Sequence, residues 1–190
     1  DDVAGFTIEE TDGSTEVDES GSTDIFTVVL DAQPTLDVVL TITSESTTEA
    51  SVNPSSITFT SEYWDTPQTV TVTGVDENVV DGDQTTNITI AILDTASDDN
   101  FDALADQTVS VDTLDDDVAG FTIEETDAAT EVDESGSTDI FTVVLDAEPT
   151  SDVILTITSD DTGEATVPAS VTFTAVDWDT PQTVTVTGVD

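Results

Sequence analysis

The chain contains no lysine, arginine, histidine or cysteine among its 190 residues. Without basic side chains it cannot neutralise phosphate groups, which excludes nucleic acid and anionic membrane surfaces as partners. Without cysteine it forms neither disulfides nor thiolate metal sites. The same absences remove the Ser–His and Cys–His pairs of hydrolytic enzymes and leave only carboxylate pairs for acid–base chemistry. We therefore expect that the protein is not an enzyme.

Long hydrophobic runs are also missing from the sequence. No apolar run approaches the roughly 20 residues of a membrane-spanning helix, so we expect no insertion into a membrane. The chain has neither an initiator methionine nor a signal-peptide pattern. We interpret it as a piece of something longer.

Acidic residues dominate what is present, with 44 Asp and Glu and a formal net charge of -44. A charge of this size opposes a compact state and is typical of disordered chains. However, hydrophobic residues make up 36% of the chain, and Val, Ile, Leu and Phe alternate with Thr, which is enough to build a core. A folded polyanion needs cations from its surroundings, and carboxylate oxygens favour hard cations, Ca²⁺ above all.

An internal repeat organises the sequence. "DVAGFTIEETD" begins at residue 2 and again at residue 117, and "WDTPQTVTVTGVD" begins at 64 and again at 178. Self-similarity at this spacing indicates tandem domains. We predict the end of a preceding linker at 1–2, a first repeat at 3–114, an acidic linker at 115–117, and a second repeat at 118–190 that lacks its last two strands.

Period-two alternation predicts about seven strands in the first repeat. We expect Phe6 and Ile8, Val70 and Val72, and Ile88, Ile90 and Ile92 to point inward. Seven short strands in about 110 residues predict an all-β protein of tandem immunoglobulin-like antiparallel β-sandwiches. The expected strands are 5–10, 24–30, 37–43, 56–60, 68–75, 85–93 and 105–111.

Three stretches carry a resemblance to a known family: "DDDVAGFTIEE", "VDESGSTDIFTVVL" and "TVTGVDENVVDGD". They resemble the Calx-β motif, known from the calcium-binding domains of sodium–calcium exchangers and from tandem repeats of large bacterial surface proteins. The resemblance covers the first repeat and as much of the second as is present. It implies a seven-stranded sandwich that binds Ca²⁺ in loops at one end, next to the following domain.

The resemblance also implies the metal ligands. They lie in the turn before the second expected strand, in the acidic cluster after the fifth, and in the acidic triplet that ends the repeat. Because Ca²⁺ takes six to eight oxygens, one site needs several carboxylates from loops that meet in space. The candidates are Glu19, Asp76, Glu77, Asp81, Asp115, Asp116, Asp117, Glu134 and Asp190, with Asn78 and Asp83 nearby.

The sequence departs from the family pattern at two places. "SESTTEASVNPSS" stands where the family usually has an aspartate after its third strand, and Gln84 stands where a further Glu is common. These departures indicate a site reduced to one or two ions. The alternative interpretation of the same acidity is a solvated surface adapted to high salt.

We expect a structural calcium-binding repeat of a long extracellular or cell-surface protein, an adhesin stalk or filament, whose junctions Ca²⁺ makes rigid. Its partners are then neighbouring repeats of the same chain and, in a filament, identical chains, with any glycan or surface ligand bound through other domains.

Two alternatives stay open. Trp64, Trp178 or the Thr-rich face could contact a carbohydrate or a protein. The simpler interpretation is that each Trp packs over the edge of its sandwich. A neighbouring chain could instead complete the second repeat by strand addition.

Overall fold

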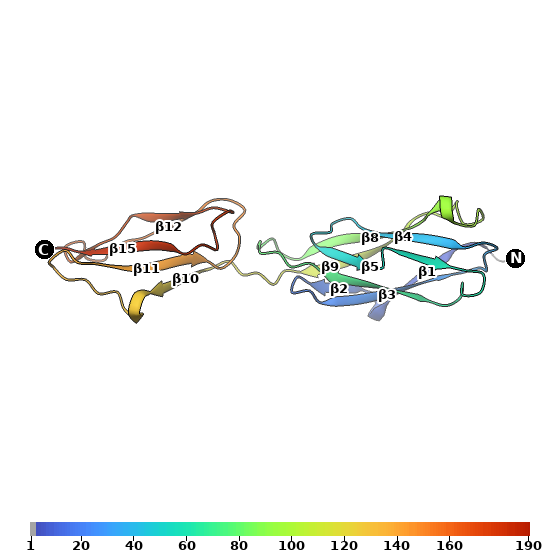
Figure 1. Cartoon of the computed structure of the whole chain (residues 1–190), viewed down its shortest axis with the longest axis horizontal. Coiled ribbons are helices and arrows are strands. Elements are labelled where there is room, and N and C mark those ends of the chain that lie inside the picture. The colour runs from blue at the N-terminus through green and yellow to red at the C-terminus, as the bar shows by residue number, and fades with distance from the viewer. Residues whose placement is uncertain (1–2) are drawn as a thin grey trace. The chain divides into compact units, whose positions relative to one another are not determined.

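The computed structural model describes residues 3–190 and consists almost entirely of β-strands (Figure 1). It forms two compact units. The first comprises the described residues up to Glu77 together with Asp81–Asp116, and the second comprises Asn78–Val80 together with Asp117–Asp190. The expected all-β fold is confirmed. The proposed preceding linker at 1–2 lies outside the described residues.

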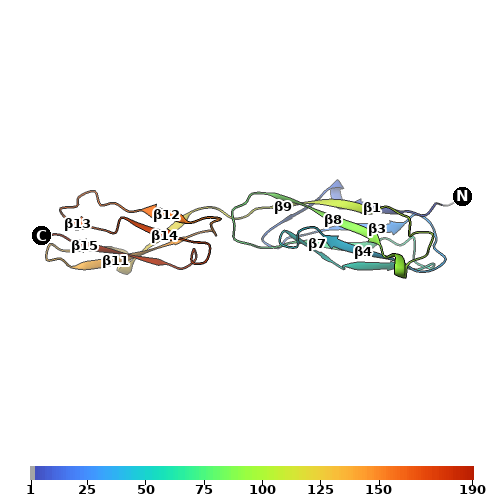
Figure 2. The ribbon, with the colours of Figure 1, turned by 90° about the horizontal axis from the view of Figure 1, so that it is seen from above.

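The first unit is a sandwich of two sheets (Figures 1 and 2). Within the described residues one sheet has the order β1-β3-β7-β5 and the other the order β2-β9-β8-β4-β6. All neighbouring strands are antiparallel except β2 and β9, which are parallel and pair Thr15 with Val111. The strands are β1 Phe6–Glu10, β2 Thr15–Asp18, β3 Thr23–Leu30, β4 Val38–Ser44, β5 Ala50–Asn53, β6 Ser56–Phe59, β7 Gln68–Gly74, β8 Gln84–Ile92 and β9 Gln107–Leu114, with 3-10 helices η1 Thr11–Gly13 and η2 Asp94–Ala96.

Alternate residues of each strand build the core between the two sheets. Phe6, Val70, Val72, Ile88 and Ile90 are buried, as their alternation with Thr predicts. Ile8 and Ile92 are half-buried and pack against the same core. The threonines between them face outward, where a β-branched polar residue suits a strand.

Two short strands, β2 and β5, were not predicted. Each has four residues, which is too short for alternation to stand out from a loop. The last strand also lies later than expected and continues to Leu114, because β9 pairs with β2 along residues 111–114. This parallel pairing brings the turn after β2 next to the acidic end of the repeat.

The second unit has the same order of strands but fewer of them. Its sheets are β10-β11-β15-β13 and β12-β14, and the small core consists of Val143, Leu145, Phe173 and Val184. No counterpart of β2, β8 or β9 is present among residues 117–190. The strands are β10 Phe121–Glu125, β11 Thr138–Leu145, β12 Val153–Thr156, β13 Ala165–Thr166, β14 Ser170–Phe173 and β15 Gln182–Gly188, with a 3-10 helix η3 Thr126–Ala128.

Both tryptophans pack against the core of their own unit. Trp64 contacts the first core and Trp178 the second. The Trp64 carbonyl accepts a hydrogen bond of 3.2 Å from the Leu30 amide, and the Trp178 carbonyl accepts one of 3.1 Å from the Leu145 amide. The predicted packing of each Trp against its own sandwich is confirmed.

Candidate metal centre

A tight turn between β2 and β3 carries Glu19. The Gly21 amide donates a 3.2 Å hydrogen bond to the Asp18 carbonyl, and the Glu19 amide donates a 3.1 Å bond to the Leu114 carbonyl at the end of β9. Gly21 has φ 90°, a left-handed conformation that glycine adopts without steric cost. The turn is therefore fixed both within itself and to the last strand of the repeat.

Gly74, at the end of β7, holds the same turn from the other side. Its amide donates a 3.0 Å hydrogen bond to the Ser22 carbonyl. A Cβ atom at this position would overlap the Asp18 carbonyl oxygen. Only glycine allows the two backbones to approach so closely, which sets the position of Glu19 relative to the loop that follows β7.

The Glu19 side chain is fully buried, with 0% of its surface exposed. Neither of its carboxylate oxygens accepts a hydrogen bond from any residue in 3–190. Burial, followed by the nearby charges of Asp115, Glu77, Asp81 and Glu49, raises the pKa of Glu19 to about 7. A buried carboxylate without a partner is costly, and the chain has no basic side chain that could supply one.

The carboxylates around Glu19 come from the loop between β7 and β8 and from the end of β9. Glu19, Glu77 and Asp81 each offer one oxygen within 4.8 Å of the others, and Asp115 also has an oxygen within 4.8 Å of Glu19. Asp115 is tied to the loop, because its Oδ2 accepts a 2.7 Å hydrogen bond from the Gly82 amide. Its own amide donates a 3.2 Å bond to Asp83 Oδ1.

This spacing fits a calcium ion. Oxygens that bind one Ca²⁺ at 2.3–2.6 Å lie at most about 5 Å from one another across the ion. The oxygens of Glu19, Glu77 and Asp81 satisfy that limit. A divalent cation among them would also neutralise the buried Glu19 charge, so donor type, spacing and electrostatics agree.

The other predicted ligands have different positions. Asp76 and Asp116 are exposed and belong to neither of the carboxylate groups found among residues 3–190. Asp117 begins the longer segment of the second unit. Glu134 and Asp190 also belong to that unit, and both are exposed.

Glu49 is a neighbour of Glu19 that sequence reasoning missed. It immediately precedes β5, and its carbonyl accepts a 2.9 Å hydrogen bond from the Val75 amide. Its charge is among those that raise the pKa of Glu19. Glu49 lies within "SESTTEASVNPSS", the stretch that lacks the expected aspartate. The internal repeat could have pointed to Glu49, because Glu164 stands at the equivalent position of the second repeat.

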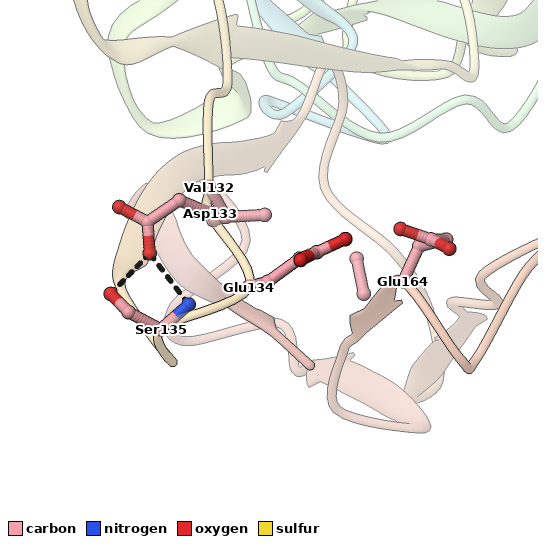
Figure 3. Close-up of a pocket in the computed structure, with 6 residues that line it drawn as sticks. Val132, Asp133, Glu134, Ser135 and Glu164 are labelled. Carbon is pink, nitrogen blue, oxygen red and sulfur yellow. Dashed lines mark hydrogen bonds between the residues drawn. The ribbon is translucent and has the colours of Figure 1, made fainter. Parts of the chain in front are cut away.

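The second repeat contains the beginning of the same arrangement. Figure 3 shows Glu134 extending toward the segment that carries Glu164, on the two sides of a cavity of about 630 Å³. The turn is also preserved, since the Gly136 amide donates a 3.2 Å hydrogen bond to the Asp133 carbonyl, as Gly21 does to Asp18. The Ser135 amide adds a 2.9 Å bond to Asp133 Oδ1. Glu134 is exposed here, because residues 117–190 contain no counterpart of the acidic loop after β7 or of β9.

Comparison with known proteins finds similarity to solved structures only. No protein-family model matches the chain, and no curated protein matches it. The apo form of the Calx CBD1 domain is 14% identical, covering 59% of this chain and 98% of that one, with a TM-score of 0.40. The CBD12 structure from CALX1.2 is 14% identical, covering 96% and 75%, with a TM-score of 0.39.

Domains 5–6 of the S-layer protein SbsC are 18% identical, covering 100% of this chain and 86% of that one, with a TM-score of 0.40. These identities and TM-scores are low. The fold is therefore assigned from the strands and sheets of the chain itself. Among residues 3–190, no helix is long and apolar enough to cross a bilayer.

Proposed function

We propose that the chain is a calcium-binding structural repeat of a long extracellular or cell-surface protein, such as an adhesin stalk or a surface filament. The observation that carries this proposal is Glu19, a fully buried carboxylate without a hydrogen bond among residues 3–190. Glu77, Asp81 and Asp115 surround it, and the chain has no basic side chain to balance their charges. Calcium is the cation that best suits several carboxylates at this spacing.

In this proposal calcium stiffens the junction between repeats. Asp115 is a neighbour of Glu19, and Asp116 and Asp117 follow it directly in the sequence. Three adjacent carboxylates repel one another unless a cation lowers their mutual charge. Binding of Ca²⁺ at Glu19, Glu77, Asp81 and Asp115, with Asp116 or Asp117 as a further ligand, would couple this linker to the body of the first repeat.

Calorimetric titration and thermal melting test the binding itself. The chain is titrated with CaCl₂ and melted in millimolar calcium and in EDTA at matched ionic strength. We expect calcium at about 1,000 times its Kd to stabilise the first repeat by about 4 kcal/mol, which corresponds to a rise in Tm of more than about 10 °C. Glu19→Gln should remove most of this gain, whereas Glu134→Gln, at the equivalent exposed position, should retain it.

Small-angle X-ray scattering tests the effect on the junction. We expect calcium to lengthen the particle, and the double substitution Asp116→Asn with Asp117→Asn to weaken that effect. Equal melting temperatures and equal particle dimensions in calcium and EDTA would instead support an acidic surface adapted to salt, without a metal centre.

A further inference from the structure

An aspartate followed directly by glycine occurs at only two places in the chain, Asp12–Gly13 and Asp81–Gly82. The amide nitrogen of a glycine is unusually accessible, because glycine has no Cβ atom beside it. It can reach the carboxyl carbon of the preceding aspartate and react with it. The second pair bears on the metal centre, since an oxygen of Asp81 lies within 4.8 Å of oxygens of Glu19 and Glu77.

The reaction is a spontaneous isomerisation of the aspartate. The Gly82 nitrogen attacks Cγ of Asp81, an N–Cγ bond forms, and the hydroxyl of the carboxyl group leaves with the amide proton as water. The product is a five-membered succinimide ring. Asp81 is exposed, so water reaches the ring and opens it again. Addition of water at Cγ restores aspartate, whereas addition at the former main-chain carbonyl gives isoaspartate, and no other reactant is needed.

Both polar groups of the peptide bond between Asp81 and Gly82 are held by hydrogen bonds. The Gly82 amide donates a 2.7 Å hydrogen bond to Asp115 Oδ2. The Asp81 carbonyl accepts a 3.2 Å hydrogen bond from Gln84 Nε2. The same nitrogen donates a 3.1 Å bond to the Gly82 carbonyl. The amide must give up its bond to Asp115 before its nitrogen can attack the Asp81 side chain, so this arrangement opposes the reaction.

We propose that Asp81–Gly82 is an isomerisation site of the chain, and that Asp115 and Gln84 suppress the reaction by fixing the peptide bond between the two residues. Both are positioning residues, because neither reacts with Asp81. Gln84 suits this role through its side-chain amide, since an ionised glutamate has no donor for the two carbonyls. The departure of Gln84 from the family pattern therefore supplies a contact that a glutamate would lose.

Isomerisation would change the metal ligand and its loop together. In isoaspartate the main chain runs through Cγ and is longer by one carbon atom, while the free carboxylate is attached directly to Cα. The carboxylate at position 81 would then be displaced relative to Glu19 and Glu77. This consequence rests on the proposed function, in which Asp81 binds calcium. Bound calcium would hold the Asp81 carboxylate and slow the reaction further, so the site would deteriorate mainly while it is empty.

The test measures isoaspartate at both Asp–Gly pairs of the whole chain after prolonged incubation in EDTA at neutral pH. Peptide mapping by chromatography and mass spectrometry separates isoaspartate from aspartate and detects the succinimide by the loss of one water. We expect Asp115→Ala and Gln84→Ala each to raise the rate at Asp81 severalfold. Asp115→Asn, which keeps an acceptor oxygen, should stay near the wild-type rate. The rate at Asp12 should be equal in all four proteins and serves as the internal reference.

Two results would overturn the proposal. The first is a rate at Asp81 in the two alanine variants that does not exceed the wild-type rate; a lower rate in Asp115→Ala would make that carboxylate a base for the reaction. The second is equal acceleration at Asp12, which would indicate general loosening of the fold. A parallel incubation in calcium tests the proposed function separately. If calcium leaves the rate at Asp81 unchanged while Asp115→Ala raises it in EDTA, the control of isomerisation stands and Asp81 is not a calcium ligand.

Discussion

At the residue scale, the buried charge of Glu19 opposes folding when no cation is bound. It is fully buried among Glu49, Glu77, Asp81 and Asp115. The substitution Glu19→Gln removes the charge and keeps the shape. In EDTA at pH 8 we expect it to increase the free energy of unfolding of the first repeat by about 1–3 kcal/mol.

The same substitution should have the opposite effect in saturating calcium, because a metal ligand is then lost. Thermal melting with and without calcium measures both signs. Glu134→Gln is the matched control and should change the Tm little in either condition, since Glu134 is exposed. Destabilisation by Glu19→Gln in EDTA would contradict the assignment of Glu19 as an unsatisfied buried charge.

The raised pKa of Glu19 predicts a pH dependence in the absence of metal. The folded state holds this proton up to a pKa of about 7, whereas the ordinary value is 4.5. Between these values the folded state binds more protons than the unfolded state, so the stability contributed by Glu19 falls as pH rises from about 4.5 to 7. Denaturant melts across this range, in wild type and Glu19→Gln, isolate the contribution as the difference between the two curves.

Calcium binding should show the linked effect. The ion displaces the Glu19 proton, so calcium affinity should fall as the pH drops below about 7. Titrations in buffers of different ionisation enthalpy would detect the released proton. Release of the same number of protons by Glu19→Gln would assign the titrating group to another carboxylate.

Asp98 is a buried carboxylate whose two oxygens both accept hydrogen bonds. Its Oδ2 accepts hydrogen bonds of 2.6 Å from the Thr35 amide and 2.9 Å from the Leu36 amide, and its Oδ1 accepts one of 2.7 Å from Asn100 Nδ2. Hydrogen bonds, first that from the Thr35 hydroxyl, hold the pKa of Asp98 far below its ordinary value. Its stabilising effect should be present above about pH 4 and lost as pH falls further.

We expect Asp98→Ala to lower the Tm of the first repeat markedly, because several donors lose one acceptor. The exposed neighbour provides the control, and Asp99→Ala should change the Tm little. Equal effects of the two substitutions would show that the hydrogen bonds to Asp98 contribute nothing particular.

At the scale of elements, alternation of Thr with Val and Ile was sufficient to predict the long strands and most of the core. It was not sufficient for β2 and β5, which have four residues each and contain several polar side chains. Without β5, Glu49 could not be placed beside Glu19. The parallel pairing of β2 with β9, which brings Glu19 to the end of the repeat, joins segments far apart in sequence and leaves no local signal.

The composition predicted a bound cation but did not predict which acidic side chains would lie together. Asp76 and Glu77 are adjacent in sequence, yet Asp76 is exposed and only Glu77 has an oxygen near Glu19. That distinction depends on the path of the chain after β7. Asp76 and Asp116 as ligands therefore stay predictions.

Gly74 permits a test of how β7 positions the turn that carries Glu19. A methyl group at this position would overlap the Asp18 carbonyl oxygen, a backbone atom that cannot move alone. We expect Gly74→Ala to weaken calcium binding by roughly tenfold or more by displacing Glu19, measured by calorimetry. Gly188→Ala creates the same overlap with the Asp133 carbonyl in the second repeat, and it should leave calcium affinity unchanged.

At the scale of the whole molecule, the 1–190 chain should contain two parts of unequal stability, with residues 118–190 less stable than the first repeat. The second core is limited to Val143, Leu145, Phe173 and Val184, and Phe121 and Ile123 are more than half exposed. A smaller buried apolar surface gives a smaller free energy of unfolding. We expect hydrogen exchange in EDTA to be much faster in residues 118–190 than in β3, β4, β7 and β8, with two separate melting transitions. A single transition with equal protection would contradict this inequality.

The pairing of β2 with β9 also has a consequence for the order in which a repeat folds during synthesis. Thr15 cannot form its strand pairing until Val111 has been synthesised. In contrast, the sheet of β1, β3, β5 and β7 uses no residue after Gly74. Contacts between segments so distant in sequence form slowly. Each complete repeat would therefore leave its ribosome as a half-sandwich and close last at the carboxylates. The final step of folding and the first opportunity to capture an ion would coincide.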